Sequence, residues 1–168
     1  MRYCIVSETY PPEVNGVALT VQSLERGLRS RGHVVDVVHP RPAVGEPALA
    51  DETLVSGARI PRYPGLRFGW PARRLLRRQW MARRPDAIYV ATEGPLGWSA
   101  MRVADELGIP SASGFHTRFD EYLRDYGAGF LQPLAMRWMR RFHNASAATI
   151  VPTRELATIL ARAGFDRI

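Results

Sequence analysis

The chain has 168 residues, of which 46% are hydrophobic, and this size and composition fit one globular domain with its own core. No apolar run approaches the roughly 20 residues of a membrane-spanning helix, and the N-terminus lacks the basic and then apolar layout of a signal peptide, so we expect a cytoplasmic protein. The single cysteine, Cys4, excludes a disulfide framework and a cysteine metal cluster. The net charge of +7 comes from 23 arginines against 16 acidic residues, with no lysine.

Segments with strand and helix patterns alternate along the chain, which is typical of a parallel sheet covered by helices. Strands are predicted near residues 2–7, 34–39, 54–59, 87–91, 111–115 and 148–151. The first and last helices are predicted to follow the N-caps Asn15 and Thr153 and to stop at Gly32 and Gly164. Other helices are predicted over residues 71–84, 96–107 and 133–143. We therefore expect one α/β domain over residues 1–168, a Rossmann-like, open, mostly parallel sheet with helices on both faces.

Two apolar stripes at helical spacing are predicted to face the core. They are Leu134, Trp138 and Phe142 in the helix 133–143, and Leu156, Ile159 and Leu160 in the last helix.

A strongly basic segment runs from Arg59 to Arg84, with nine arginines and no acidic residue among apolar side chains. Its second half predicts a short amphipathic helix with Pro71 at the first position. Three interpretations are open: a solvated face, an interfacial membrane helix and a nucleic-acid patch. Trp and Leu beside Arg favour burial among lipid headgroups, and no zinc-finger, RRM or KH motif is present, so we expect an anionic membrane surface as partner and no nucleic acid. The residues expected to contact the inner face of the cytoplasmic membrane are Arg73, Arg74, Arg77, Arg78 and Trp80.

The loop after the first predicted strand, residues 8–16, ends on a glycine just before a helix. A glycine lets a ligand approach the backbone, and the first-turn N–H groups of a helix are unpaired donors, so Gly16 and Val17 are candidate phosphate-binding residues. A strand-to-helix turn without a ligand explains the same pattern. The dinucleotide fingerprint G-x-G-x-x-G and the P-loop G-x-x-x-x-G-K-[ST] are absent, which disfavours a plain Rossmann dehydrogenase or kinase.

Two more loops, 92–97 and 115–122, are expected at the same edge of the sheet, because the carboxyl ends of parallel strands meet there. The three loops form a candidate pocket for a phosphate-bearing, hydroxyl-rich ligand. His116 directly follows a predicted buried strand and is a candidate acid–base residue, with a structural hydrogen-bonding role as the alternative. No Asp-x-Asp, H-E-x-x-H or other metal-ligand spacing occurs, so we expect no metal and no other cofactor.

Four segments resemble the N-terminal half of retaining GT-B glycosyltransferases of family four, especially the branch of GDP-mannose-dependent α-mannosyltransferases. They are residues 8–17, 91–97, 114–122 and 151–156, and the resemblance spans essentially the whole chain. It implies a metal-independent enzyme that moves a sugar, mannose or glucose, from a nucleoside diphosphate sugar to a hydroxyl of a lipid or glycan acceptor.

The resemblance also implies residue roles. The backbone N–H of Gly16 would meet the donor pyrophosphate, and His116 would contact the transferred sugar near the reacting carbon. The residues implied on the acceptor and sugar side are Thr9, Tyr10, Asn15, Glu93, Gly94, Thr117, Arg118 and Asp120. The second domain of the family, which supplies most nucleotide contacts, is not in this sequence, and the sequence stops where another strand would begin. We therefore expect the chain by itself to be inactive and to bind the donor weakly at most.

Two functions of other classes remain alternatives. A sugar-nucleotide epimerase would use a similar half-cleft with His116 as acid or base. A non-catalytic module would bind phosphate or another anion without turnover. Neither explains all four segments at once.

Overall fold

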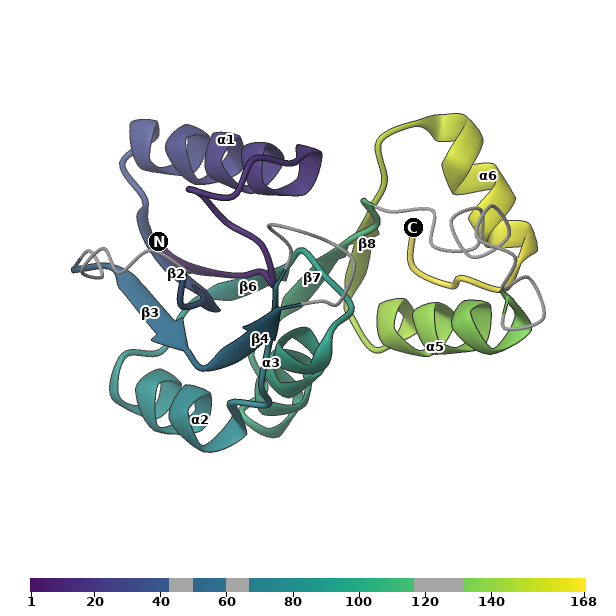
Figure 1. The fold of residues 1–168 in the computed structure, drawn as a ribbon. Coiled ribbons are helices and arrows are strands. Elements are labelled where there is room, and N and C mark those ends of the chain that lie inside the picture. The colour runs from purple at the N-terminus through teal and green to yellow at the C-terminus, as the bar shows by residue number, and fades with distance from the viewer. Residues whose placement is uncertain (43–49, 60–66, 117–131) are drawn as a thin grey trace.

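The computed structural model describes residues 1–42, 50–59, 67–116 and 132–168. Its elements run in the order β1 (Arg2–Val6), α1 (Gly16–Ser30), β2 (Val34–Pro40), β3 (Glu52–Val55), β4 (Gly57–Arg59), β5 (Arg67–Gly69), α2 (Arg73–Ala82), β6 (Ala87–Val90), α3 (Pro95–Glu106), β7 (Ser111–Gly114), α5 (Gln132–Asn144), β8 (Ala148–Ile150) and α6 (Arg154–Arg162). Six strands form one sheet in the order β3-β2-β1-β6-β7-β8, and every neighbouring pair is parallel (Figure 1). The predicted Rossmann-like fold is therefore confirmed.

Helices cover both faces of this sheet, with α1 on one side and α2 and α3 on the other (Figure 1). Side chains of a strand alternate between the two faces, so the consecutive apolar residues of β1 enter different cores. Cys4 and Val6 pack in the core with α2 and α3, whereas Ile5 packs in the core with α1. β1 is therefore buried on both sides, as a central strand of a parallel sheet should be.

The helix ends that were predicted from capping residues are confirmed. Asn15 Oδ1 accepts a hydrogen bond from the backbone N–H of Ala18 at 2.9 Å, which starts α1. Thr153 does the same for α6. Gly32 and Gly164 follow these helices with φ of 80° and 86°, a left-handed conformation that glycine adopts without strain.

The predicted strand 54–59 is two strands in the structure. β3 extends the main sheet beside β2, whereas β4 pairs with β5, which was not predicted, in a separate antiparallel sheet. Gly57 permits this change of partner, because a Cβ there would overlap the backbone carbonyl of Phe68. The predicted start of α2 is also wrong by two residues, since the helix begins at Arg73 and Pro71 precedes it.

The apolar stripes of α5 and α6 were predicted only in part. Phe142 is fully buried, but Leu134 and Trp138 are 66% and 51% exposed. In α6, Ile159 is 44% exposed although its neighbour Leu160 is buried. These side chains are exposed because α5 and α6 lie beside β8, the strand at the edge of the sheet, where packing covers a narrower part of each helix (Figure 1).

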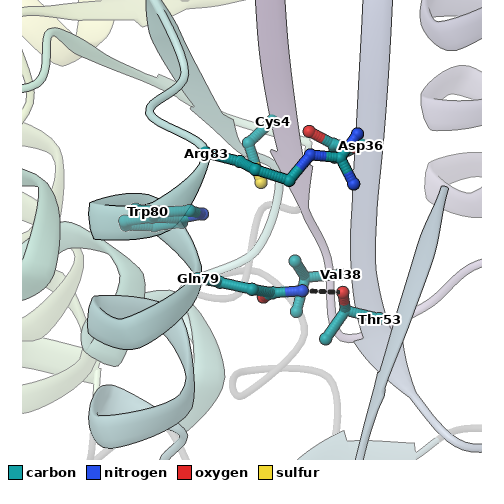
Figure 2. Close-up of a pocket in the computed structure, with 7 residues that line it drawn as sticks. All are labelled: Cys4, Asp36, Val38, Thr53, Gln79, Trp80 and Arg83. Atoms are coloured by element: carbon teal, nitrogen blue, oxygen red, sulfur yellow. Dashed lines mark hydrogen bonds between the residues drawn. The ribbon is translucent and has the colours of Figure 1, made fainter.

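A small cavity lies between α2 and the strands β1 to β3 (Figure 2). Its volume of about 30 Å³ suits a single water molecule and excludes a substrate. Cys4 lines it, and burial raises the pKa of this thiol to about 12, so the thiol is protonated and unreactive at neutral pH.

Candidate active site

The two central strands of the sheet, β1 and β6, flank a topological switch point at its carboxyl edge. The chain runs from β1 to β2 on one side, while β6 lies on the other side of β1, so the loops that follow β1 and β6 leave in opposite directions. In open parallel sheets, ligands bind at such a switch point. The backbone N–H of Glu8 donates to Thr92 Oγ1 at 2.8 Å, which ties the two loops together.

Glu8, in the loop after β1, is a buried carboxylate that lies against the loop after β6. It is 7% exposed and accepts hydrogen bonds from the backbone N–H of Gly69 and, at 2.9 Å, from that of Leu96 in the first turn of α3. Burial raises the pKa of Glu8 to about 7, against the effect of these donors. A Cβ at Gly94 would overlap Glu8 Oε1, so the close approach of the carboxylate requires a glycine there. The sequence prediction did not select Glu8, although an acidic residue directly after a buried strand was a usable signal.

The loop after β1 is held by its own side chains. Asn15 Nδ2 donates to Thr9 Oγ1 at 2.6 Å, and Thr9 Oγ1 donates to Glu13 Oε2 at 2.6 Å. This chain of bonds fixes the loop in front of α1. Gly16 is exposed at the start of the helix, and a Cβ on it would meet no atom of the described residues within 4 Å. No residue of the described ranges therefore covers the Cα of Gly16, where a ligand can approach the N-terminus of α1.

Tyr10 does not line the open side of this loop. Its side chain is 8% exposed, its hydroxyl donates to Glu25, and its ring lies 4.7 Å from that of His39. The prediction that Tyr10 contributes to the acceptor side is thus wrong for its side chain, because the ring packs in the core with α1.

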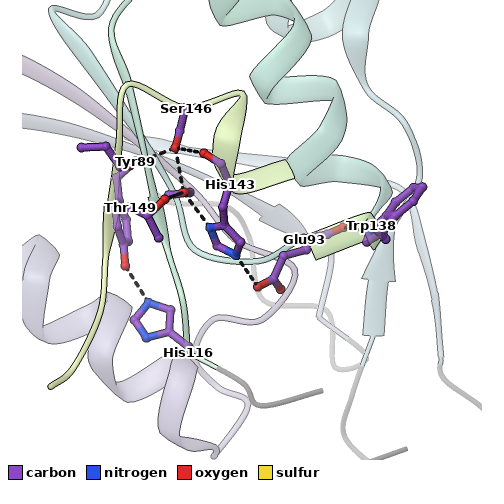
Figure 3. A network of polar contacts seen from close by, with 9 residues as sticks. Tyr89, Glu93, His116, Trp138, His143, Ser146 and Thr149 are labelled. Carbon is purple, nitrogen blue, oxygen red and sulfur yellow. Dashed lines mark hydrogen bonds and ion pairs between the residues drawn. The ribbon is translucent and has the colours of Figure 1, made fainter. Parts of the chain in front are cut away.

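His116, two residues after the end of β7, is oriented by Tyr89 of β6. The Tyr89 hydroxyl and His116 Nε2 are 2.6 Å apart (Figure 3). Burial raises the pKa of Tyr89 to about 12 and lowers the pKa of His116, so both side chains are neutral at neutral pH. When the Tyr89 hydroxyl donates to Nε2, the proton of the neutral imidazole is on Nδ1, and in the other tautomer Nε2–H donates to the hydroxyl oxygen. Gly114 makes room for this pair, since a Cβ there would overlap the Tyr89 hydroxyl.

Glu93, in the loop after β6, is held by a polar network that reaches into the protein (Figure 3). Its Oε1 lies 3.1 Å from Nε2 of the fully buried His143. His143 Nδ1 in turn lies 2.8 Å from Ser113 Oγ, which also contacts Ser146 and Thr149. The sequence prediction did not select His143, and its partners, 30 and 50 residues away, leave no local pattern that could have identified it.

The structure thus places Gly16, Glu93, Gly94 and His116 at the loops that follow β1, β6 and β7. The other predicted residues of the third loop, Thr117, Arg118 and Asp120, lie outside the described residues. Within the described ranges, no group of three or more His, Cys, Asp or Glu side chains could hold a metal ion.

The basic helix α2 presents four arginines to solvent, namely Arg73, Arg74, Arg77 and Arg78. Trp80 is 4% exposed and packs in the core, so the prediction that it contacts a membrane is wrong. The exposed apolar side chains nearby are instead Met81, at 61%, and Trp70, at 52%. Among the described residues, no helix is long and apolar enough to cross a bilayer.

Comparison with known proteins identifies the chain by sequence, because residues 14–168 match Glycosyltransferase Family 4. The chain belongs to glycosyltransferase family 4. It is 30% identical to a GDP-mannose-dependent alpha-mannosyltransferase of Mycolicibacterium smegmatis, over 100% of this chain and 46% of that protein. It is 28% identical to an alpha-monoglucosyldiacylglycerol synthase of Acholeplasma laidlawii, over 99% of this chain and 44% of that protein. This family 4 chain therefore spans about half the length of the curated relatives it matches.

Solved structures show the same fold. The family 4 chain superposes on a UDP-GlcNAc 2-epimerase of Methanocaldococcus jannaschii, crystallised with UDP-GlcNAc and UDP, with a TM-score of 0.61 and 15% identity, over 99% of this chain and 44% of that one. It superposes on an alpha-glucosyltransferase in complex with UDP and DNA with a TM-score of 0.50 and 13% identity, over 90% of this chain and 37% of that one. The domain is thus one Rossmann-like half of a GT-B fold.

Proposed function

We propose that this chain forms the acceptor-side half of a retaining hexosyltransferase, which moves mannose or glucose from a nucleoside diphosphate sugar to a hydroxyl of a lipid or glycan. The observation that carries the proposal is the open N-terminus of α1 at Gly16, beside the switch point of the sheet. The names of the relatives, a mannosyltransferase and a diacylglycerol glucosyltransferase, support the choice of sugar and acceptor.

The backbone N–H groups of Gly16 and Val17 bind the donor diphosphate in this proposal. Unpaired N–H groups at a helix N-terminus carry partial positive charge and suit the negative charge that develops on a leaving diphosphate. They need no reorganisation during the reaction, since α1 is already capped by Asn15. No metal is required for this stabilisation.

His116 and Glu93 act on the sugar and the acceptor. The neutral imidazole of His116, with its proton on Nδ1, donates a hydrogen bond to the transferred sugar near the reacting carbon. Glu93, held by His143, accepts a hydrogen bond from an acceptor hydroxyl. The side chains proposed to complete the acceptor side are Thr9 and Asn15, together with Thr117, Arg118 and Asp120 and the backbone of Gly94.

Transfer also requires a second half of the enzyme in this proposal. The chain covers 46% of the mannosyltransferase relative, which leaves the length of another domain. We expect the 168-residue chain alone to be inactive.

The exposed arginines of α2 dock the enzyme on the cytoplasmic face of an anionic membrane, where a lipid acceptor is reached. Each basic residue near such a surface contributes about 1 kcal/mol at most, and salt screens this attraction. Replacing Arg74, Arg77 and Arg78 with glutamine should therefore lower binding to anionic vesicles by roughly a hundredfold at low salt. If the wild-type protein does not bind anionic vesicles at low salt, the proposed membrane docking is disproved.

A pair of glycine variants on α1 tests the phosphate site. In the full-length enzyme, Gly16→Ala should raise the KM for GDP-mannose or UDP-glucose by roughly tenfold, the effect of about 1.4 kcal/mol, because the methyl group fills space that the phosphate needs. Thermal stability should not fall, since no described atom lies within 4 Å of that methyl group. Gly27→Ala, later in the same helix, is the control and should leave the KM unchanged. An unchanged KM in Gly16→Ala would reject this site.

A further inference from the structure

A groove outside the candidate active site lies where α2, α3 and α5 meet. Its volume is about 350 Å³, at the lower end of the roughly 300–1,000 Å³ of small-molecule sites. Three arginines, one from each helix, line it together with two tryptophans: Arg73, Arg102, Arg141, Trp98 and Trp138. The catalytic residues proposed above do not line it.

Among the described residues, the positive charge of this groove is neutralised only at Arg73. Arg73 forms an ion pair with Glu106 at 2.6 Å. Arg102 and Arg141 are exposed and form no ion pair with any residue in the part of the chain that the structure describes. Planar guanidinium groups are the preferred protein donors to phosphate, which they bind with paired hydrogen bonds. The groove thus carries two guanidinium groups that no described acidic residue pairs with.

The aromatic wall is held in place by its own contacts. Trp98 and Trp138 meet edge to face with ring centroids 5.1 Å apart, and Trp98 also packs on Phe142 at 5.3 Å. Trp138 Nε1 donates to the backbone carbonyl of Glu93 at 3.2 Å. Trp98 Nε1 is buried and has no hydrogen-bond partner among the described residues. The wall is therefore an aromatic surface fixed by ring contacts and by one hydrogen bond of Trp138.

We propose that this groove binds the phosphodiester headgroup of one anionic phospholipid, with Arg102 and Arg141 on the phosphate and the two tryptophans against the glycerol and the first acyl carbons. The tryptophan rings suit this boundary because they offer apolar area at the level of the headgroups. Arg73 belongs both to the groove and to the exposed face of α2, so a bound headgroup would belong to the membrane on which α2 docks. The proposal rests on the docking function proposed above, and it adds a defined site for one lipid.

Two lipid probes separate this site from docking in general. The first is monomeric dihexanoyl phosphatidylglycerol, measured by calorimetric titration of the full-length product of the gene. The second is vesicles of equimolar phosphatidylglycerol and phosphatidylcholine, measured by co-sedimentation. Arg102→Gln/Arg141→Gln should weaken binding of the monomeric lipid by roughly tenfold or more. The matched control Arg26→Gln/Arg154→Gln removes the same charge from exposed positions outside the groove and should leave this affinity unchanged.

The outcomes distinguish the two proposals. If the monomeric lipid binds wild type and the control variant but not the groove variant, the result supports the lipid site in the groove. If vesicles do not bind in the same experiment, only the proposal that α2 docks on a membrane is contradicted. Equal losses in the groove and control variants overturn the groove, because they show general charge attraction. Inorganic phosphate that binds as tightly as the monomeric lipid overturns the lipid assignment.

Discussion

Replacing Gly94 with alanine should destabilise the protein because the new methyl group displaces the Glu8 carboxylate. The added Cβ would overlap Glu8 Oε1 and lie 2.6 Å from Glu8 Cδ. The backbone itself would accept alanine, since Gly94 has φ of −74° and ψ of −177°. The cost therefore comes from the buried carboxylate that must move.

The magnitude follows from the two hydrogen bonds that Glu8 accepts, from the backbone N–H groups of Gly69 and Leu96. Above about pH 8, where Glu8 is ionised, a hydrogen bond to its charged carboxylate contributes about 1.5–3 kcal/mol, so loss of one bond and weakening of the other gives about 3 kcal/mol. For a domain of this size, that loss lowers the Tm by roughly 6–12 °C.

Urea denaturation followed by circular dichroism, at fixed pH and ionic strength, measures this difference. Gly16→Ala is the control, because its methyl group meets nothing in the described structure within 4 Å. A Gly94→Ala protein within about 0.5 kcal/mol of wild type would refute the reasoning, since ordinary surface substitutions fall in that range.

Three further predictions concern the buried polar groups. The pKa of Glu8 rises from 4.5 to about 7 on folding, so its protonated form stabilises the native state below pH 4.5, and this contribution, about 3 kcal/mol, is lost as the pH rises through 7. Urea titrations across this pH range should show the fall in unfolding free energy with pH, and Glu8→Gln should reduce that fall. An unchanged pH dependence in Glu8→Gln contradicts the assignment. Tyr89→Phe removes the hydroxyl that orients His116, so kcat should fall by roughly tenfold while the Tm stays unchanged. This loss is smaller than the roughly 10²–10⁴-fold loss expected when an acid–base group is removed. Full activity in Tyr89→Phe would show that the pair has no positioning role. His143→Ala should lower the unfolding free energy by about 2–4 kcal/mol and raise the KM for the acceptor, because Glu93 loses the side chain that holds it. His143→Gln should restore part of the stability and part of the acceptor affinity. A loss of stability with an unchanged KM would limit His143 to a structural role.

Local patterns predicted the parts of the fold that local physics determines. The caps at Asn15 and Thr153 follow from side-chain bonds to N–H groups within three residues. The loops at the carboxyl edge follow from the alternation of strands and helices. In α2, the basic amphipathic pattern was predicted to place Trp80 at a membrane together with the arginines, and this was wrong for Trp80. Leu76 and Trp80 are four residues apart and share the buried face, so the tryptophan belongs to the core and the arginines to the surface.

The polar groups at the centre of the site could not be predicted in this way. Glu8 contacts Gly69 and Leu96, which are 61 and 88 residues away in the sequence. His143 meets Glu93 across 50 residues. Such pairs depend on the order of the strands in the sheet, which hydrophobic periodicity does not determine. The glycines that make room for them, such as Gly94, look like ordinary loop residues in the sequence.

The most direct test of the proposed function is a transfer assay on the full-length product of the gene that encodes this chain. The protein is incubated with radiolabelled GDP-mannose or UDP-glucose and with membrane lipids, and the lipid phase and the free sugar nucleotides are analysed separately. We predict that label enters the lipid or glycan fraction with an α linkage and that Gly16→Ala reduces this transfer. Label that remains in an interconverted sugar nucleotide without any acceptor would identify an epimerase, and binding without turnover would identify a non-catalytic module; either result would contradict the proposed transferase.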